Sequence, residues 1–444
     1  MRPLSKNRTA RRARPAAASS RRDKKPSVGP LRQWLRRVAR PLRRGARSKR
    51  PWVALVLAIP LALMFLWALA NQVAWAGPLL ADTARAVVGV DAVSRLEEIA
   101  YDAADRWNRF WRSEAQPEAH WNTSPQVLVT PVPNFTTDAL PPTDAADKGE
   151  FPPANVGPLF REMAAPGDGV WVPVVDPNHP DEPPVLYKTL IHPDRKRSWA
   201  ELFVVAIDLR RAQIFAAAGT LEPKASTQEG QQYKRRGVIP EVRYDGLLAA
   251  FNGGFKAEHG QWGMKVDDVT LLPPRDRGCT IAGFADHTLR IGTWTALKES
   301  EPEMRFWRQT PSCMVEKGTL NPGLVNEESI SWGAALGGGT VVRRSAFGLN
   351  PARNIAFVGV SNATTARAIA TGMQHAGARD VAQLDINWSY PHFIMFRQSK
   401  AGQRQGYSLF DGFAYENNEY LSRAATRDFF YVVRKDSSVS QRDK

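Results

Sequence analysis

The sequence predicts an α+β protein with mostly antiparallel sheets and a few flanking helices, together with one N-terminal transmembrane helix. Short apolar, β-branched and aromatic runs dominate the C-terminal half, and turn residues separate them, which is typical of antiparallel strands. Helical periodicity after the N-terminal region is clearest in two stretches, residues 82–114 and 364–376. A long uncharged segment near the N-terminus supplies the predicted membrane span.

The basic character of the chain belongs to its N-terminal tail. Residues 1–50 contain 19 Lys and Arg and one acid, Asp23, whereas the whole chain of 444 residues has a formal charge of +16. The remainder is therefore close to neutral. We predict a disordered tail that contacts anionic lipid headgroups. A nucleic-acid-binding arm is the alternative, and the amphipathic basic pattern of residues 31–44 disfavours it.

Residues 51–81 contain no charged side chain. About 20 apolar residues span a bilayer, and Trp52, Trp67 and Trp75 lie near the ends of this segment, where aromatic residues favour the interface. The basic tail before it predicts a cytoplasmic N-terminus and a domain outside the cytoplasmic (inner) membrane, held by a single-pass anchor. A signal peptide cleaved after Ala76 is the alternative, but the apolar core is longer than is usual for one.

Composition divides the chain into five parts. Residues 82–114 follow a helical apolar pattern, which predicts a stalk helix or a helix that packs back on the domain. Residues 116–195 hold 16 of the 33 prolines, as expected where an extended linker passes into short strands joined by proline turns. The predicted parts are a basic disordered cytoplasmic tail (1–50), a transmembrane anchor (51–77), an amphipathic stalk helix (82–114), a Pro-rich linker (115–153) and one folded domain (154–436).

Several strand pairings in that domain are predicted from apolar runs and turn residues. They are a strand at 200–208 with a return strand at 211–218, a strand at 247–255 that runs into a Gly-Gly turn, a hairpin arm at 263–272, a pair formed by 278–284 and 289–294, and a final aromatic strand at 429–433 that closes a sheet.

A strand–helix–strand unit follows within residues 354–396. Residues 354–360 form a β-branched and aromatic run, and about four turns of helical pattern come next. Ser361, Asn362 and Thr364 are placed to cap that helix, and Gly377 to end it.

A second apolar run, residues 381–384, stops at the carboxylate of Asp385. An acid just past the C-terminal end of a strand is a common way to hold a charge at the mouth of a pocket. The alternative is that Asp385 only begins a turn, as Asp often does.

Three motifs resemble the phosphodiester glycosidase domain family. Residues 251–255 (FNGGF) resemble its NGGFF motif, and residues 344–348 (RSAFG), which follow a glycine-rich turn at 337–339, resemble its RTAIG. Residues 384–389 (LDINWS) stand where the family has LDGGGS. The resemblance, which covers most of the C-terminal half, implies that residues 154–436 are a phosphodiester-glycosidase-like domain acting on a sugar-1-phosphodiester.

The last motif departs from the family pattern at its three glycines, which Ile386, Asn387 and Trp388 replace. Glycines in such a loop permit positive φ and a close backbone approach to a ligand. Trp388 instead offers a flat apolar face on which a sugar ring stacks. The loop is therefore either a rebuilt sugar site or a site without catalysis, and we favour the first.

Glycosidic or phosphodiester cleavage needs carboxylates at the sugar carbon and leaving oxygen, and a cation for the phosphate. Asp385 is the predicted nucleophile, base or electrostatic stabiliser. Glu258, His259 and His392 are candidate proton donors. For Glu258 and His259 the alternative is a solvated loop, which is the commoner environment of such residues.

Substrate binding is assigned to two further groups of residues. Arg344 is the predicted anion clamp, with a surface or ion-pair role as its alternative. Asn252 and the amides of Gly253 and Gly254 are predicted to bind a phosphate or sugar hydroxyl, and the alternative for Asn252 is a turn cap. Trp388 and Ser389 complete the predicted substrate-binding residues.

No metal or cofactor motif occurs in the sequence, and a divalent ion has no support there. Cys279 and Cys313 follow the predicted anchor, where an oxidising compartment would allow one disulfide, but the sequence does not establish that they meet.

The predicted function is a membrane-anchored, extracytoplasmic hydrolase of sugar phosphodiesters or phosphate-linked envelope glycans. The alternative is a catalytically inactive glycan-binding or envelope-assembly module on the same scaffold, which would use Trp388 and Tyr390 as stacking surfaces. A third hypothesis makes residues 1–50 the functional part.

Overall fold

The computed structural model describes residues 90–112, 114–121, 149–325, 332, 340–387 and 390–435. The predicted basic tail, membrane anchor and most of the Pro-rich linker lie outside the described residues. No helix among the residues that are described is long and apolar enough to cross a bilayer.

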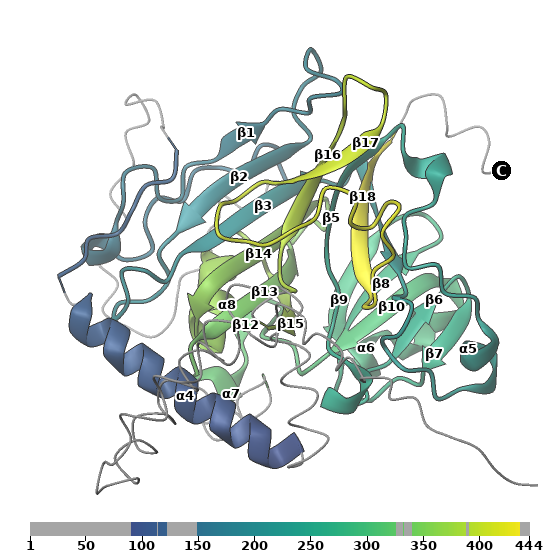
Figure 1. The fold of residues 1–444 in the computed structure, drawn as a ribbon, viewed down its shortest axis with the longest axis horizontal. Coiled ribbons are helices and arrows are strands. Elements are labelled where there is room, and N and C mark those ends of the chain that lie inside the picture. Colours follow the sequence, from purple (N-terminus) through teal and green to yellow (C-terminus); the bar gives the residue numbers. More distant parts are fainter. Residues whose placement is uncertain are drawn as a thin grey trace, which may run out of the picture. The chain divides into compact units, whose positions relative to one another are not determined.

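Sheets dominate the described part of the chain, as the sequence predicts, and the strand pairs are antiparallel (Figure 1). An eight-stranded sheet carries the strand–helix–strand unit. In spatial order its strands are β1 (Val172–Val174), β2 (Leu186–Ile191), β3 (Leu202–Asp208), β14 (Ile355–Thr364), β13 (Val342–Leu349), β15 (Asp380–Ile386), β11 (Val315–Glu316) and β12 (Thr319–Leu320).

Two five-stranded sheets complete the β structure of the described residues. The first has the order β7 (Val269–Leu272), β6 (Met264–Val266), β10 (Met304–Thr310), β8 (Cys279–Phe284) and β9 (Leu289–Thr293). The second has the order β17 (Arg404–Ser408), β16 (Phe393–Gln398), β5 (Leu247–Asn252), β18 (Phe429–Arg434) and β4 (Ala212–Ala217).

The helices of the described residues are few and mostly short. They are α4 (Val90–Trp111), α5 (Gln228–Gln232), α6 (Trp294–Leu297), α7 (Pro322–Val325) and α8 (Ala366–His375), with 3-10 turns η2 (Arg161–Met163), η3 (Glu241–Arg243), η4 (Ala257–His259) and η5 (Lys298–Glu303). Only part of the predicted 82–114 helix is tested, because residues 82–89 lie outside the described residues; α4 ends at Trp111.

One aromatic stack in the core joins β strands of two sheets beside the glycine turn. Phe251 of β5 stacks on Phe347 of β13 at 5.7 Å and on Phe430 of β18 at 5.4 Å between ring centroids. All three rings are almost completely buried. Burial of large aromatic side chains contributes heavily to core stability, and this stack fixes where β5 ends and the turn begins.

The strand–helix–strand unit is present, but its helix begins later than predicted. Ser361, Asn362 and Thr364 lie within β14 rather than at the helix N-terminus. Thr365 caps α8 instead, since its side chain accepts a hydrogen bond from the amide of Ala368. The β-branched and polar residues extend the strand because they pair with β13.

The end of the helix agrees with the prediction, whereas the position of Asp385 differs slightly. Gly377 follows α8 with φ of +111°, a conformation that favours glycine. Asp385 lies inside β15, one residue before its end, rather than just past the strand.

The predicted hairpin of 200–208 with 211–218 is wrong. The two segments form β3 and β4, but β3 pairs with β2 and β14, while β4 pairs with β18 in another sheet. The prediction of β18 as a strand is confirmed, but it lies between β5 and β4 rather than at an edge. Hydrophobic periodicity identifies strands and carries no information on which sheet each one joins.

The predicted pairing of β8 with β9 is confirmed. The segment predicted as one hairpin arm, 263–272, instead contains both strands of a hairpin, β6 and β7. Cys279, at the start of β8, forms a disulfide with Cys313, a possibility that the sequence left open.

Candidate functional site

The glycine turn after β5 is shaped by close backbone contacts. The amide of Gly253 donates to the carbonyl of Asp428 at 2.9 Å, and a Cβ on Gly253 would lie 2.2 Å from Oδ2 of the same residue. A Cβ on Gly254 would lie 2.8 Å from Cζ of Arg308. Real Cβ atoms do not approach so closely, so these two positions require glycine for space rather than for positive φ.

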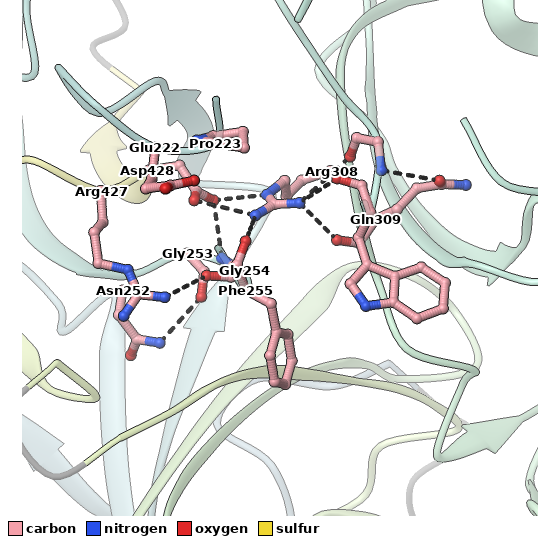
Figure 2. A network of polar contacts seen from close by, with 12 residues as sticks. Glu222, Pro223, Asn252, Gly253, Gly254, Phe255, Arg308, Gln309, Arg427 and Asp428 are labelled. Atoms are coloured by element: carbon pink, nitrogen blue, oxygen red, sulfur yellow. Dashed lines mark hydrogen bonds and ion pairs between the residues drawn. The ribbon is translucent and has the colours of Figure 1, made fainter. Parts of the chain in front are cut away.

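Asp428 and Arg308 form a buried ion pair against this turn, as Figure 2 shows. Oδ2 of Asp428 accepts from Nε of Arg308 at 2.8 Å and from the amide of Gly254 at 2.8 Å, and Oδ1 accepts from Nη2 of Arg308 at 3.2 Å. The other guanidinium bonds of Arg308 go to the carbonyls of Phe255, Trp262, Gly263 and Gln309. A forked pair of this kind fixes the geometry of both partners.

Asp385 and Arg427 form a second buried ion pair on the same turn. Nη1 of Arg427 lies 2.5 Å from Oδ2 of Asp385, and the two side chains are 9% and 2% exposed. Nη2 of Arg427 donates to the carbonyl of Gly254 at 3.3 Å, and the amide of Asp385 donates to the carbonyl of Gly253 at 3.0 Å. The guanidinium carbon of Arg427 lies 4.4 Å from the ring centroid of Tyr390, within cation–π range.

The pKa values of this pair are shifted by burial and by the pairing. Burial raises the pKa of Asp385 above its ordinary value, while Arg427 opposes the shift and the charge on Asp428 adds to it. Burial alone would lower the pKa of Arg427, but Asp385 outweighs it and the net shift is upward. A buried carboxyl group against a guanidinium combines an acid–base group with a cation that neutralises phosphate charge, and cleavage of a phosphodiester needs both.

Side chains from three strands connect Asp385 to the end of β5. Nδ2 of Asn252 donates to Oγ of Ser345 at 2.8 Å, and that hydroxyl donates to the carbonyl of Asp385 at 3.0 Å. The amide of His392 donates to Oδ1 of Asn252 at 3.3 Å. The structure therefore brings Asn252, Gly253, Gly254 and Asp385 together with the backbone of His392.

The imidazole of His392 faces Tyr420 and Glu419. Its Nε2 lies 2.7 Å from the Tyr420 hydroxyl and 3.4 Å from Oε1 of Glu419. Burial lowers the pKa of His392 to about 4 and raises the pKa of Glu419 to about 7. His392 is therefore neutral at pH 7, and Glu419 is the carboxyl of this cluster that titrates near neutrality.

Glu258 and His259 lie apart from this network, on the exposed turn η4. Oε1 of Glu258 lies 3.6 Å from Nζ of Lys256 and 3.6 Å from Nε2 of His259. This is the solvated environment that the sequence left as the alternative.

Arg344 is completely buried. Its guanidinium donates to the carbonyls of Trp332, Thr340 and Thr364 at 2.7–3.2 Å and to Oε1 of Gln383 at 3.1 Å. Burial lowers the pKa of Arg344 to about 9. The side chain holds three chain segments together, so the predicted role as an anion clamp has no support in its contacts.

The amides predicted to bind substrate are also engaged within the protein, since both Gly253 and Gly254 donate to Asp428. Trp388, Ser389 and the glycine-rich turn at 337–339 lie outside the described residues. Among the described residues, no group of three or more His, Cys, Asp or Glu side chains is arranged to hold a metal ion.

Sequence reasoning missed the two arginines and the second aspartate. Arg427 and Asp428 immediately precede the aromatic strand β18, and Arg308 interrupts the apolar strand β10. A charge inside or next to a buried strand is a signal that could have identified them, because buried charges need a partner.

No protein-family model and no curated protein matches the chain. Among solved structures it is similar to the catalytic domain of zebrafish N-acetylglucosamine-1-phosphodiester alpha-N-acetylglucosaminidase, auto-inhibited by its pro-peptide, at 14% identity and a TM-score of 0.37, over 59% of this chain and 87% of that one. It is also similar to a hypothetical protein from Synechocystis, at 10% identity and a TM-score of 0.32, over 58% of this chain and 65% of that one. These similarities concern the course of the backbone and carry no argument about chemistry.

Proposed function

We propose that this chain is a membrane-anchored, extracytoplasmic hydrolase of sugar phosphodiesters or phosphate-linked envelope glycans. The observation that carries the proposal is the Asp385–Arg427 pair at the glycine turn, where a carboxyl group with a raised pKa lies against a guanidinium. The resemblance of the FNGGF and LDINWS motifs to phosphodiester glycosidases supports the same chemistry.

The reaction divides between these two residues. The bond between the sugar carbon and the phosphate oxygen breaks, a water oxygen bonds to that carbon, and the proton that the water loses ends on the leaving phosphate or in solvent. Asp385 supplies or accepts the proton in this exchange, and Arg427 neutralises the phosphate charge. Asp428 and Arg308 are positioning residues, since they hold the glycine turn against which the first pair lies.

The disulfide supports a location outside the cytoplasm. Cys279 and Cys313 are bonded, and disulfides persist mainly in oxidising compartments. An uncharged segment preceded by 19 basic residues supports a single-pass anchor with a cytoplasmic N-terminus.

The test uses the full-length protein in nanodiscs with N-acetylglucosamine-1-phosphodiester and a panel of related sugar phosphodiesters, with and without divalent ions. We expect turnover that is lost in Asp385→Ala. Glu258→Gln is the matched control, because Glu258 is an exposed carboxyl outside the network, and it should retain activity. Absence of turnover on the whole panel, from protein with a normal melting transition, would overturn the proposal.

A glycan-binding module without catalysis is the second candidate. It is favoured by contacts within the protein, since Asp385 is paired with Arg427 and both glycine amides donate to Asp428. For such a module we expect calorimetry to show saturable glycan binding without turnover, and we expect Trp388→Ala to abolish the binding.

A further inference from the structure

Helix α4 packs on the domain through its polar side. Asp105 is buried and accepts two bonds from Arg197, at 2.7 and 2.8 Å, and Arg197 also bonds to Asp194 at 2.7 Å. Tyr101 and Asn108, which lie on the same side of the helix at a spacing of four and three residues from Asp105, are partly buried. Among the side chains of α4 that are described, residues 99–111, this charged pair makes the buried contact with the domain.

The apolar side of α4 faces outward. It carries four of the nine large apolar side chains that are exposed among the described residues: Ile99 (63% exposed), Trp107 (64%), Phe110 (73%) and Trp111 (64%). Ala103 lies between Ile99 and Trp107 at helical spacing and is also exposed. The rings of Trp107 and Trp111 are 5.6 Å apart, so the aromatic residues form one continuous surface.

The chain before α4 indicates what covers this surface. The uncharged segment ends at residue 81 and α4 begins at Val90, so residues 82–89 separate them. Eight residues reach at most about 28 Å, which limits how far the N-terminal end of α4 can lie from the end of that segment. Tryptophan and phenylalanine favour the headgroup region of a bilayer, and an arginine such as Arg106 on the polar flank suits lipid phosphates.

We propose that the outward face of α4, formed by Ile99, Ala103, Trp107, Phe110 and Trp111, lies on the surface of the lipid bilayer. The proposal rests on the membrane anchoring in the proposed function and is independent of hydrolysis. It makes α4 a helix that binds the domain by charge and the membrane by its aromatic residues, so that the domain is held at the bilayer rather than free on a tether.

The experiment uses the full-length protein, one copy per nanodisc, in a mixture of phosphatidylethanolamine and phosphatidylglycerol. Both native cysteines are in a disulfide, so a single introduced cysteine takes a nitroxide label. Ala103→Cys reports the outward face, and Asp102→Cys the polar flank one residue away. Val242→Cys, at an apolar position that is 85% exposed on η3, is the matched control outside α4.

For each label we measure the ratio of its collision rate with oxygen to its collision rate with a water-soluble nickel complex. We expect this ratio to be several-fold higher at position 103 than at positions 102 and 242. Trp107→Ser combined with Trp111→Ser should return the label at 103 to the values of position 242. Equal nickel access at all three positions, in protein that co-floats with lipid, would overturn the contact of α4 with the bilayer and leave the membrane anchor in place.

Two other results would also overturn the proposal, and each has its own signature. Spin–spin broadening of the label at 103 in vesicles, with nickel access at 103 in single-copy nanodiscs, would mean that a second copy of the chain covers this face. Failure of the chain to co-float with vesicles would remove the anchor and this proposal together, while the hydrolysis assay would still test the catalytic part of the proposed function separately.

Discussion

Two neighbouring residues of β13 lead to two different kinds of buried polar structure. The hydroxyl of Ser345 donates to the carbonyl of Asp385, whose carboxylate pairs with Arg427. The guanidinium of its neighbour Arg344 instead bonds to uncharged oxygens, such as the carbonyl of Trp332. The pKa of Arg427 is raised by its carboxylate, whereas burial lowers the pKa of Arg344 to about 9. The buried arginine at the candidate site faces a carboxylate, whereas Arg344 faces uncharged oxygens and holds chain segments together.

The largest effect on stability that this comparison predicts is that of Arg344→Leu. The substitution removes the guanidinium donor from the carbonyls of Trp332, Thr340 and Thr364, of which Trp332 keeps a bond from Gln383 at 3.3 Å. We therefore expect the free energy of unfolding to fall by on the order of 4 kcal/mol. Urea unfolding measures the loss, and turnover per folded molecule should be retained. Loss of turnover at unchanged stability would instead restore the anion-clamp role that the sequence predicted.

Gly254→Ala tests the close contact between the glycine turn and the guanidinium of Arg308. The new Cβ would lie 2.8 Å from Cζ of the fully buried Arg308, so the ion pair with Asp428 must shift, at a cost of about 2 kcal/mol in unfolding free energy. Gly292→Ala is the control, because its nearest neighbour is the side-chain end of Glu316 at 3.2 Å. Equal melting temperatures for the two variants would contradict this account of the turn.

The stability of the protein should depend on pH through the carboxyl group of Glu419. Its folded pKa of about 7 lies above the ordinary value of 4.5, so its contribution to stability is complete below pH 4.5 and is lost as the pH rises through 7. Glu419→Gln should therefore be more stable than the wild type at pH 8, by on the order of 2 kcal/mol, and nearly equal to it at pH 4.5.

The contribution of His392 to stability depends on pH with the opposite sign, because its folded pKa of about 4 is below the ordinary value of 6.5. Its contribution is present above pH 6.5 and is lost as the pH falls towards 4. Glu419 lies 3.4 Å from His392, so the difference between the wild type and Glu419→Gln reports Glu419 together with its effect on His392. Thermal melts from pH 4.5 to 8 provide the measurement, and parallel curves would rule out the assignment of a titration near neutrality to Glu419.

The smallest predicted effect concerns the start of α8. Thr365→Ala removes the cap of the Ala368 amide and should cost about 1 kcal/mol of unfolding free energy. Ser361→Ala should cost close to nothing, because the Ser361 hydroxyl is buried in β14 without a hydrogen-bond partner. The reverse order, measured by urea unfolding, would favour the capping predicted from the sequence.

These examples show why the sequence identifies elements better than contacts. The strands β5, β15 and β18 and the meeting of the glycine turn with Asp385 follow from local periodicity and motif order. The partner Arg427 lies 42 residues along the chain from Asp385, and only the pairing of β18 with β5 brings it there. The placement of β4 beside β18 was missed for the same reason.

A chemical role for Asp385 is tested by the kcat of full-length Asp385→Asn on N-acetylglucosamine-1-phosphodiester, beside the wild type and Asp428→Asn. The two variants each remove one carboxylate from a buried pair with arginine, so their melting temperatures report the structural cost that they share. The account predicts that Asp385→Asn lowers kcat by about 10²–10⁴-fold, well beyond Asp428→Asn at equal fraction folded. Equal activity of the two variants would contradict a chemical role for Asp385.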